Sequence, residues 1–365
     1  MAENRKRVIA LVIPSLGPGG MERVMSELAG YFSRQSDLEV HLVLYGINRD
    51  VFYALPEKIV IHRPDFAFGT SSRFRSTLKT LFFLRQTISR LQPHDVMSFG
   101  EYWNSFVLLS LVGLNYPVYV SDRCQPDKSL GLLHDILRRL LYRRAQGVIV
   151  QTEKAKVIYS AFIRQQKIRV IGNPIRSRDV FAVVQKENIV LTVGRLIQSK
   201  HHDELIRLFV SIGQPGWKLV IVGGDALKQQ NMVRLQCLID ELGAGSTVEL
   251  AGNRADVEQY YCKSKIFAFT SSSEGFPNVI GEAMAAGLPV VSFDCVAGPS
   301  DMLTDGVDGF LVPLFDYVCF KRKLKLLMDN KELSARMGEK ARENIGRYSL
   351  DGIGRVYHRL LVSSK

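Results

Sequence analysis

SSSEGFPNVIGEAMAAGLPVVSFDC, residues 271–295, decides the fold that we expect for this chain. It follows an apolar run, residues 266–270, that is typical of a buried strand. Pro277 suits the first turn of a helix because the N–H that proline lacks is not needed there. Gly287 suits the left-handed position that ends a helix, and residues 289–293 form a second apolar run. The stretch therefore predicts a strand–loop–helix–strand unit of an α/β sheet.

Two carboxylates flank the start of this helix. Glu274 lies in the loop, and Glu282 lies roughly 8 Å along the helix axis from Pro277. A helix N-terminus with free N–H groups attracts phosphate, and a carboxylate beyond it can accept hydrogen bonds from a ribose diol. The unit could thus hold a sugar nucleotide, although two such acids also occur as plain surface residues. The backbone groups that we expect to be free are those of Gly275, Phe276, Asn278 and Val279.

Glu274 and Glu282, with seven residues between them, resemble the E-x7-E motif of retaining glycosyltransferases. The context, EGFPNVIGEAMAAGLPVV followed by SFDCVAGPSDMLTDGVDGFLVP, is similar to glycosyltransferase family four over about forty contiguous residues. Weaker similarity to the same family extends along nearly the whole chain. Within the family, the sequence most resembles bacterial polysaccharide and glycan-assembly enzymes. The resemblance implies a GT-B fold, in which two Rossmann-like doubly wound α/β domains face each other across a donor cleft.

Composition bounds the possible partners and compartment. The length of 365 residues suggests two domains, and no stretch approaches the ~20 apolar residues of a membrane span. The five cysteines are scattered, which favours a reducing compartment over a disulfide framework or a zinc site. The basic start and short apolar run resemble a signal peptide, but the run breaks at Pro14, so a first strand fits better. We therefore expect a cytoplasmic protein.

Positive charge is concentrated in the first half of the chain. Residues 1–180 hold 26 Lys and Arg against 15 Asp and Glu, whereas residues 181–365 hold 22 against 21. Residues 72–91 and 132–144 each combine arginines with apolar residues at helical spacing. Such helices can lie on an anionic bilayer, or can face the core with a solvated basic side. We expect a peripheral position at the inner face of the cytoplasmic membrane. No aromatic interleaving supports nucleic-acid binding.

Alternating strand and helix patterns divide the chain into two parts. We expect a first domain at residues 1–180, a linker near residues 175–186, and a second domain at residues 181–349. The resemblance assigns acceptor binding to the first domain and nucleotide-sugar binding to the second. It also implies that a helix at residues 350–363 packs back on the first domain.

Two further candidates lie in the first domain. Residues 15–20, SLGPGG, join an expected strand to a helix, and by resemblance Gly19 and Gly20 lie across the cleft from the donor phosphates. Arg123 follows the strand at residues 118–121, at the edge of a sheet where ligands bind. Many members of the family that the chain resembles carry a histidine there. Arginine cannot act as a general base, but it can bind sugar hydroxyls or phosphate.

Arg195 and Lys200 follow the strand that opens the second domain. A guanidinium and an ammonium suit a diphosphate, and they also commonly occur as solvated surface residues. By resemblance they are the donor-diphosphate pair, and Gly252 with Asn253 holds the nucleobase. We expect Glu274, Arg195, Lys200 and Arg123 to form the catalytic group.

The resemblance implies a retaining transfer in which negative charge grows on a leaving diphosphate. Arg195, Lys200 and the helix N-terminus would stabilise that charge, so we expect no metal ion and no cofactor, and the sequence has no DxD triplet. The expected substrates are a nucleotide sugar, UDP-linked by likeness to polysaccharide enzymes, and a glycan on a polyprenyl diphosphate. A sugar-nucleotide epimerase or phosphorylase on the same scaffold stays open, and so does a basic nucleic-acid-binding protein.

Overall fold

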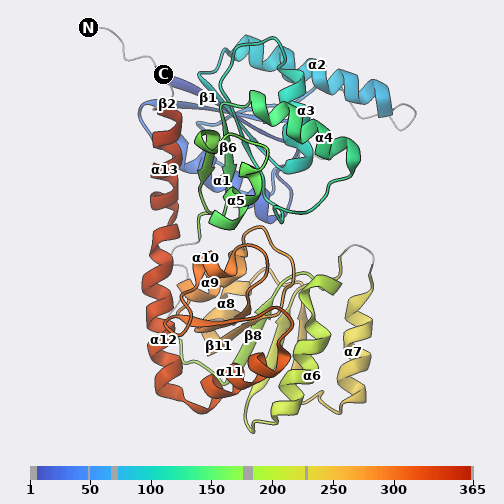
Figure 1. Cartoon of the computed structure of the whole chain (residues 1–365), viewed down its shortest axis with the longest axis vertical. Helices are drawn as coiled ribbons and strands as arrows, with labels where there is room; N and C mark the ends of the chain where they lie inside the picture. The colour runs from blue at the N-terminus through green and yellow to red at the C-terminus, as the bar shows by residue number, and fades with distance from the viewer. Residues whose placement is uncertain (1–5, 48–49, 67–72, 176–183, 227–228, 363–365) are drawn as a thin grey trace. The chain divides into compact units, whose positions relative to one another are not determined.

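The computed structural model describes residues 6–47, 50–66, 73–175, 184–226 and 229–362. The chain forms two compact units (Figure 1). Unit 1 comprises Met1–Pro174 together with Leu350–Lys365, and unit 2 comprises Ile175–Ser349. Among the described helices, none is long and apolar enough to cross a membrane.

Unit 1 is built on a seven-stranded sheet in which every neighbouring pair is parallel. The strand order is β3-β2-β1-β4-β5-β6-β7. The strands are β1 (Arg7–Ile13), β2 (Leu38–Leu44), β3 (Val60–His62), β4 (Asp95–Phe99), β5 (Val118–Ser121), β6 (Gly147–Val150) and β7 (Ile168–Val170). The helices are α1 (Gly20–Ser33), α2 (Arg73–Leu91), α3 (Glu101–Ser110), α4 (Leu132–Leu141), α5 (Glu153–Ser160) and α13 (Leu350–Val362), with short 3-10 turns η1 (Tyr142–Arg144) and η2 (Gln165–Lys167).

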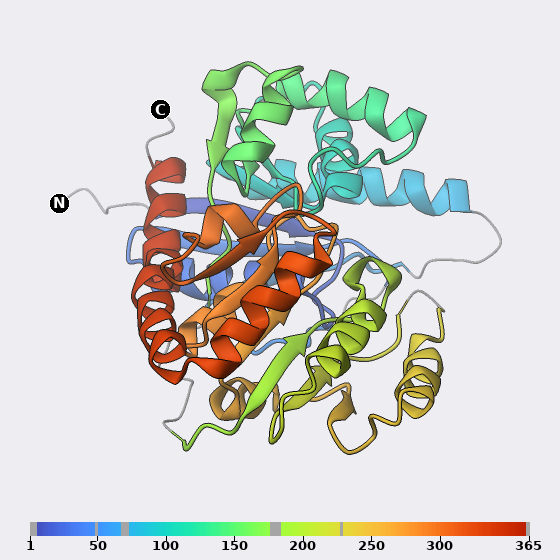
Figure 2. The same cartoon turned by 60° about the horizontal axis from the view of Figure 1, so that its bottom comes forward.

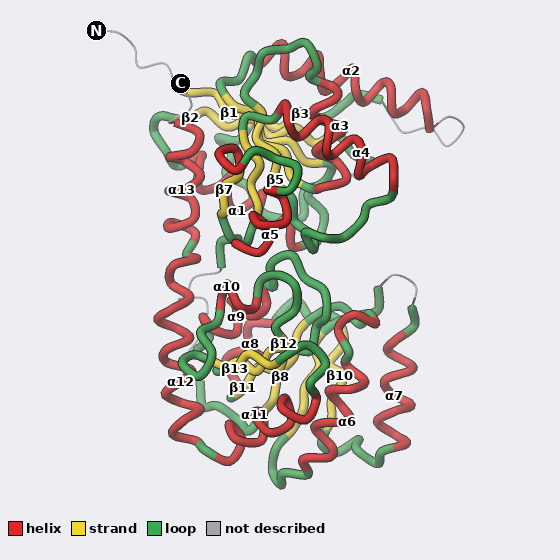
Figure 3. Tube along the Cα trace, in the orientation of Figure 1, coloured by secondary structure: helices red, strands yellow, loops and turns green. Residues whose placement is uncertain are grey.

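Helices cover both faces of this sheet (Figure 3). Alternate strand residues point to opposite faces. Ala10 and Val12 of β1 join one core cluster with buried residues of α2, α3 and α5. Helix α1 packs against β1, β2 and α13. The approach of α13 is close, because a Cβ on Gly354 would lie 2.6 Å from the ring of Tyr31.

Unit 2 has a six-stranded parallel sheet of order β10-β9-β8-β11-β12-β13. Its strands are β8 (Ile189–Val193), β9 (Lys218–Val222), β10 (Val248–Gly252), β11 (Ile266–Phe269), β12 (Val290–Phe293) and β13 (Gly309–Val312). Its helices are α6 (His202–Ile212), α7 (Asn231–Glu241), α8 (Val257–Lys263), α9 (Asn278–Ala285), α10 (Pro299–Met302), α11 (Tyr317–Asp329) and α12 (Lys331–Asn344), with 3-10 turns η4 (Gln198–Lys200) and η5 (Ile345–Tyr348). Helices α6, α7 and α11 contribute to one core cluster, α8 and α9 contribute to another, and α12 contributes to both. Figure 2 shows the chain turned by 60°, with α11 and α12 at the red end of the colour bar. The expected α/β fold of doubly wound sheets is confirmed.

The strand–loop–helix–strand unit of residues 266–293 is β11, α9 and β12. Gly287 ends α9 with a φ of +71°, as its position after the helix predicted. Pro277 was expected inside the first turn, and this is wrong by one residue. It is the residue that precedes the helix, with φ −80° and ψ 84°.

Each sheet has one point where the strand order reverses. In unit 2 the chain moves outward from β8 to β10 and then returns to the other side of β8 with β11. In unit 1 the same reversal falls between β1 and β4. Ligands of open α/β sheets bind beyond the carboxyl ends of the strands at such reversals. The loops that follow β8 and β11 are therefore the first place to look for a site.

The chain passes into and out of unit 2 at neighbouring points. The N–H of Ile175 donates to the carbonyl of Tyr348 over 2.8 Å. We expected Ile175 to begin a linker, but it is 2% exposed and belongs to the core of unit 2. A linker side chain would be solvated, whereas this one packs against Gly281 of α9. Residues 176–183 of the expected linker lie outside the described residues.

Candidate functional site

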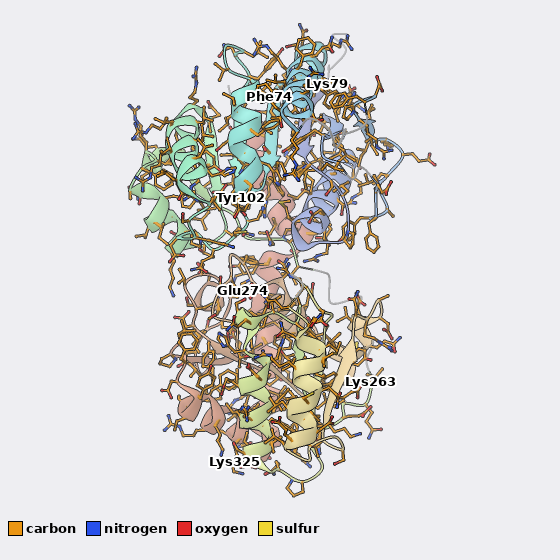
Figure 4. The ribbon with its side chains drawn as sticks, turned by 90° about the vertical axis from the view of Figure 1, so that its right-hand side faces the viewer. Phe74, Lys79, Tyr102, Lys263, Glu274 and Lys325 are labelled. Carbon is orange, nitrogen blue, oxygen red and sulfur yellow. The ribbon has the colours of Figure 1, made fainter. Side chains whose placement is uncertain are left out.

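The loops after β8 and β11 bring together Lys200 and Glu274. The Lys200 Nζ lies 2.5 Å from the Glu274 Oε1, and both side chains are 15% exposed. The ammonium also lies 5.1 Å from the ring centre of Phe269. The stem of Lys200 passes over Gly194, where a Cβ would lie 3.4 Å from the lysine Cε. Two residues expected at the site from sequence, 74 positions apart, are thus in direct contact. Figure 4 labels Glu274 in unit 2.

Three hydroxyl residues after β11, which we call the exit clamp (Thr270, Ser271 and Ser272), hold the backbone that carries Lys200. The Thr270 hydroxyl donates to the Lys200 carbonyl over 2.7 Å. The Ser272 N–H and the Ser271 hydroxyl donate to the Ser199 carbonyl over 2.9 and 3.3 Å. These bonds fix the position of Lys200 relative to β11. The sequence signal was the hydroxyl run directly after a buried strand, and we gave it no role.

His201 belongs to the same arrangement. Its backbone is left-handed, with φ 51° and ψ 42°, and it joins η4 to α6. The His201 Nε2 lies 3.0 Å from the Ser272 hydroxyl. A left-handed backbone is uncommon for a residue with a side chain, so the surrounding contacts have to hold it. This histidine helps to connect the two loops.

The N-terminus of α9 presents free backbone donors next to Glu274. The N–H groups of Gly275, Phe276 and Val279 donate to no acceptor in the part of the chain that the structure describes. The fourth expected donor is not free, because the N–H of Asn278 donates to the carbonyl of Phe276 over 3.0 Å. That short turn precedes the helix, and the sequence pattern did not reveal it. Three unbonded backbone donors at and just before a helix start still favour an anion.

Gly298 sets the entry of this helix. Its φ is +104°, and a Cβ there would lie 2.2 Å from the Cδ of Pro277. Only a residue without a side chain allows the backbone after β12 to approach Pro277 this closely. The donors at the start of α9 therefore depend on a contact from the following loop.

Glu282 lies on α9, where it is held by a neighbouring helix. The Tyr261 hydroxyl, from α8, donates to the Glu282 Oε2 over 3.0 Å. Tyr261 is 1% exposed, so its ring position is fixed by the core. Glu282 is partly exposed. The hydrogen bond from Tyr261 thus sets the orientation of the Glu282 carboxylate.

Arg195 is the remaining cation of the expected pair. Its side chain is exposed and makes no ion pair or hydrogen bond with any described residue. The backbone beside it is tightly packed, because a Cβ on Gly223 would lie 1.8 Å from the Gly194 carbonyl oxygen. The loops after β8 and β9 therefore touch through their main chains, and the guanidinium is available to an anion.

Gly252 is the last residue of the edge strand β10, and Asn253 follows it. Gly252 has a φ of +72°, and its carbonyl accepts the N–H of Gly223 over 2.9 Å. The side chain of Asn253 lies against Gly224, where a Cβ would be 3.3 Å from the asparagine Cβ. The structure thus places both residues beside the loop after β9.

Two other groups near Lys200 and Glu274 are held in their neutral forms. Burial, aided by the nearby Lys200 charge, lowers the pKa of His202 to about 3. Burial and the charge of Glu274 raise the pKa of Cys295 to about 12. Neither the imidazole nor the thiol is charged near neutral pH. The imidazole and the thiol therefore add no charge to the Lys200–Glu274 pair.

In unit 1, Gly19 and Gly20 begin α1. The Gly19 N–H donates to the Tyr53 hydroxyl over 3.0 Å. The Glu22 carboxylate covers this end of the helix, since a Cβ on Gly19 would lie 2.2 Å from its Oε2. Burial raises the pKa of Glu22. The helix start that we expected to face donor phosphates thus carries a carboxyl group of its own.

Arg123 is bound to the protein through its guanidinium. It stacks over the ring of Phe99 at 3.8 Å from the ring centre. One nitrogen donates to the Asn173 side chain, and another donates to the Tyr357 hydroxyl over 3.0 Å. Its backbone N–H donates to Glu101 over 3.2 Å. The structure therefore shows Arg123 joining β4, the end of β7 and α13.

The residue before it, Asp122, is buried within a hydrogen-bonded group. Asn104, Tyr142 and Tyr159 all donate to its carboxyl oxygens. Burial raises the pKa of Asp122. This group holds the loop after β5 in place. Its members are far apart in sequence, and no local pattern could have assembled them.

Comparison with known proteins gives two family matches that together span most of the chain. Residues 18–178 match the model described as Glycosyltransferase Family 4, and residues 175–344 match that described as Glycosyl transferases group 1. The chain is 24% identical to "GalNAc-alpha-(1->4)-GalNAc-alpha-(1->3)-diNAcBac-PP-undecaprenol alpha-1,4-N-acetyl-D-galactosaminyltransferase" of Campylobacter jejuni, over 98% of this chain and 99% of that protein.

A second relative and a solved structure are similar over the same length. The chain is 26% identical to the amylovoran biosynthesis glycosyltransferase AmsD of Erwinia amylovora, over 97% of this chain and 99% of the relative. The crystal structure of Anabaena HepE in complex with UDP-glucose superposes with a TM-score of 0.78 at 19% identity, covering 98% of this chain and 99% of that one. That likeness shows the fold.

Proposed function

The chain belongs to glycosyltransferase family four and has the GT-B fold, and from this we propose that it is a retaining, metal-independent transferase that moves a sugar from a UDP-sugar to a lipid-linked glycan. One observation carries the proposal. The Lys200–Glu274 pair lies beside three free N–H groups at the reversal point of the unit 2 sheet. An ammonium and backbone donors suit a diphosphate, and the carboxylate suits sugar hydroxyls.

The charges of the site match the charge that transfer creates. As the bond between the sugar and the β-phosphate breaks, negative charge grows on the leaving diphosphate. Lys200, Arg195 and the N-terminus of α9 stabilise this charge, and such preorganised donors are often the largest catalytic contribution. The acceptor hydroxyl attacks the face from which the diphosphate leaves, and a leaving phosphate oxygen takes its proton. The anomeric configuration is therefore retained, and the positive charges replace a metal ion.

The carboxylates position the donor. Glu274 accepts hydrogen bonds from hydroxyls of the transferred sugar, and Glu282, oriented by Tyr261, accepts from the ribose. Gly252 and Asn253 contact the base, and the side chain of Asn278 completes the donor loop. The uridine assignment is supported by Anabaena HepE, which was crystallised with UDP-glucose.

The acceptor assignment is supported by the Campylobacter jejuni relative, whose name specifies a glycan on diphospho-undecaprenol. We assign acceptor binding to unit 1, as the division of labour in the family implies. Because a polyprenyl carrier resides in a membrane, the enzyme would work as a peripheral protein at the inner face of the cytoplasmic membrane. The product would enter a bacterial surface polysaccharide or glycan.

A binding panel tests the donor assignment first. Ligand-observed NMR with UDP-, GDP- and dTDP-sugars in the presence of EDTA should show selective binding of a UDP-sugar, weakened in Glu282→Ala. Transfer to an undecaprenyl-diphosphate glycan should then proceed in EDTA and be lost in Lys200→Ala. The coupling constant of the new anomeric proton reports retention. Binding of none of these sugars, or conversion of the donor without any acceptor, would overturn the proposal, the latter in favour of an epimerase.

A further inference from the structure

Unit 2 has a cavity of about 190 Å³ at the amino ends of its strands. Its lining comes from the segments that precede β8, β9 and β11 and from helices α11 and α12. The lining residues that carry polar groups or pack in the core are Lys186, Trp217, Lys265, Leu327, Lys331 and Ser334. We call the space that these residues line the amino-end cavity.

The amino-end cavity is separate from the donor site. Lys200 and Glu274 follow β8 and β11, so they lie at the carboxyl ends of these parallel strands. Strand β8 has five residues and therefore separates the two edges of the sheet by roughly 16 Å. In Figure 4, Glu274 is labelled at one end of unit 2 and Lys325, on α11, at the other. A ligand in the cavity therefore leaves the donor site open.

Part of the lining is apolar. Trp217 and Leu327 are 6% and 1% exposed and belong to the same core cluster. Pro289, which precedes β12, also lines the space. A dry cavity of about 150 Å³ holds one benzene ring. The amino-end cavity thus has room for one ring or a short alkyl chain.

Two polar groups of the lining have no partner within the described part of the chain. The Ser334 hydroxyl makes no hydrogen bond there, although Ser334 is only 8% exposed. The indole N–H of Trp217 makes none either. Polar groups that are this well buried are normally hydrogen-bonded. A ligand with acceptor atoms would therefore satisfy donors that the protein leaves unpaired.

The charged groups that line the cavity are all cations. Lys331 begins α12, and its ammonium makes no ion pair or hydrogen bond with any described residue. The N-terminus of α12 adds partial positive charge at the same place. Lys265 donates to the side chain of Asn188 over 2.6 Å. The lining therefore favours an anion.

Lys186 is the third cation of the lining. It donates to the carbonyls of Ala286 and Gly287, just after α9, over 3.4 and 2.9 Å. Burial, and next the charge of Arg342, lower the pKa of Lys186 to about 8. A more open hollow of about 490 Å³ adjoins this lysine, and the one acid in the described lining of that hollow, Glu187, is exposed. An anion beside Lys186 would hold it in its charged form.

These features select among the possible occupants. The three lysines would repel a cation. Inorganic phosphate would leave the apolar wall in contact with water, and a neutral hydrocarbon would leave the polar donors without an acceptor. A whole nucleotide needs a larger pocket, since ligand pockets measure about 300–1,000 Å³. An organic acid with one ring or a short alkyl chain satisfies every part of the lining.

We propose that the amino-end cavity binds a small organic anion, a carboxylate or phosphate monoester carried on one ring or a short alkyl chain. The acid group binds the lysines and the Ser334 hydroxyl, and the apolar part lies against Trp217 and Leu327. This site goes beyond the proposed function and does not rest on it, because no group of the donor site takes part.

The test uses the fluorescence of Trp217. The chain has two tryptophans, so Trp103→Phe leaves Trp217 as the only indole and makes its emission a report on the cavity. Benzoate and phenyl phosphate, titrated at constant ionic strength, should change this emission with dissociation constants of about 0.1–1 mM. Benzamide, the neutral counterpart of benzoate, should bind at least about fivefold more weakly. The ratio of the first two constants shows which acid group the site prefers.

Two substitutions in the same background test the polar lining. Lys331→Gln and Ser334→Ala should each weaken benzoate binding about three- to tenfold. Lys331 is exposed, so Lys331→Gln should keep the wild-type Tm. Lys340→Gln is the matched control, because it removes the same charge from the same helix and lies outside the lining. Saturating UDP should leave the benzoate titration unchanged.

Four outcomes would overturn the proposal. They are no saturable change with either anion, benzamide binding as tightly as benzoate, equal effects of Lys331→Gln and Lys340→Gln, and displacement of benzoate by UDP, which would assign the response to the donor site. Sugar transfer is measured separately. Transfer with no benzoate binding would refute this site alone, and benzoate binding with no transfer would refute the proposed function alone.

Discussion

Replacing Thr270 by valine should slow sugar transfer, although the substitution changes none of the expected catalytic residues. Thr270 is 2% exposed, and its hydroxyl donates over 2.7 Å to the carbonyl of Lys200. Valine keeps the shape but removes the donor. Losing one such bond and leaving the carbonyl partly unsatisfied costs about 1–2 kcal/mol. If the Lys200 ammonium moves and the transition state loses the same amount of stabilisation, kcat should fall roughly five- to thirtyfold.

The assay is steady-state transfer with the donor sugar varied, together with the dissociation constant for UDP. Because the charge that Lys200 stabilises grows in the transition state, kcat should fall more than UDP affinity. Thr270→Ser retains the hydroxyl and should restore most of the rate. Thr80→Val is a matched control, since Thr80 is 3% exposed and donates to the Ser76 carbonyl over 2.9 Å within unit 1. A wild-type kcat in Thr270→Val, or an equal loss in Thr80→Val, would refute the reasoning.

Three further predictions concern stability and the packing around the site. The pKa of His202 in the folded chain, about 3, lies below the ordinary 6.5. Between these two values His202 is protonated in the unfolded chain and neutral in the folded chain. The free energy of unfolding should therefore fall by about 2 kcal/mol from pH 7 to pH 5 through this group; urea titrations should show this component in wild type and not in His202→Leu. Gly298→Ala places a Cβ against Pro277 and should cost about 1–3 kcal/mol, seen as a lower Tm and weaker UDP binding, and a wild-type Tm would contradict the packing argument. Arg123→Lys loses the planar contacts to the side chain of Asn173 and to Tyr357 and should cost about 2 kcal/mol in urea unfolding with kcat nearly unchanged; a large drop in kcat at unchanged stability would instead make Arg123 a substrate ligand.

Much of the fold could be predicted because its signals are local. Apolar runs of four or five residues marked the strands of unit 2, and Gly287 marked the end of α9. The boundary between α11 and α12 is just as local, since the Asn330 side chain accepts the N–H of Leu333 over 2.9 Å. Such a cap depends on a few consecutive residues. The misplacement of Pro277 by one residue is the usual scale of error at a helix end.

The candidate site was less accessible to sequence. That Lys200 and Glu274 share one site followed only from a family resemblance, because nothing local relates two loops that follow different strands. The exit clamp was missed because serine and threonine after a strand also suit an ordinary loop. The expectation that Arg123 meets substrate stays a prediction, and the residues that hold its guanidinium, Asn173 and Tyr357, lie 50 and 234 positions away in the sequence. Which side chains meet across a sheet edge is decided by tertiary packing, which no window of sequence contains.

The path of the chain through the two units determines the order in which they can complete their folding during synthesis on the ribosome. All strands and helices of unit 2 have been synthesised once Ser349 has been added. The hydrogen bond between Ile175 and Tyr348 can then join the two ends of this unit. Unit 1 began earlier but still lacks α13. Until that helix is released, the Tyr31 side of α1 has no cover and Arg123 has no Tyr357 hydroxyl to bind. The part of the protein made first is thus completed after the part inserted into it.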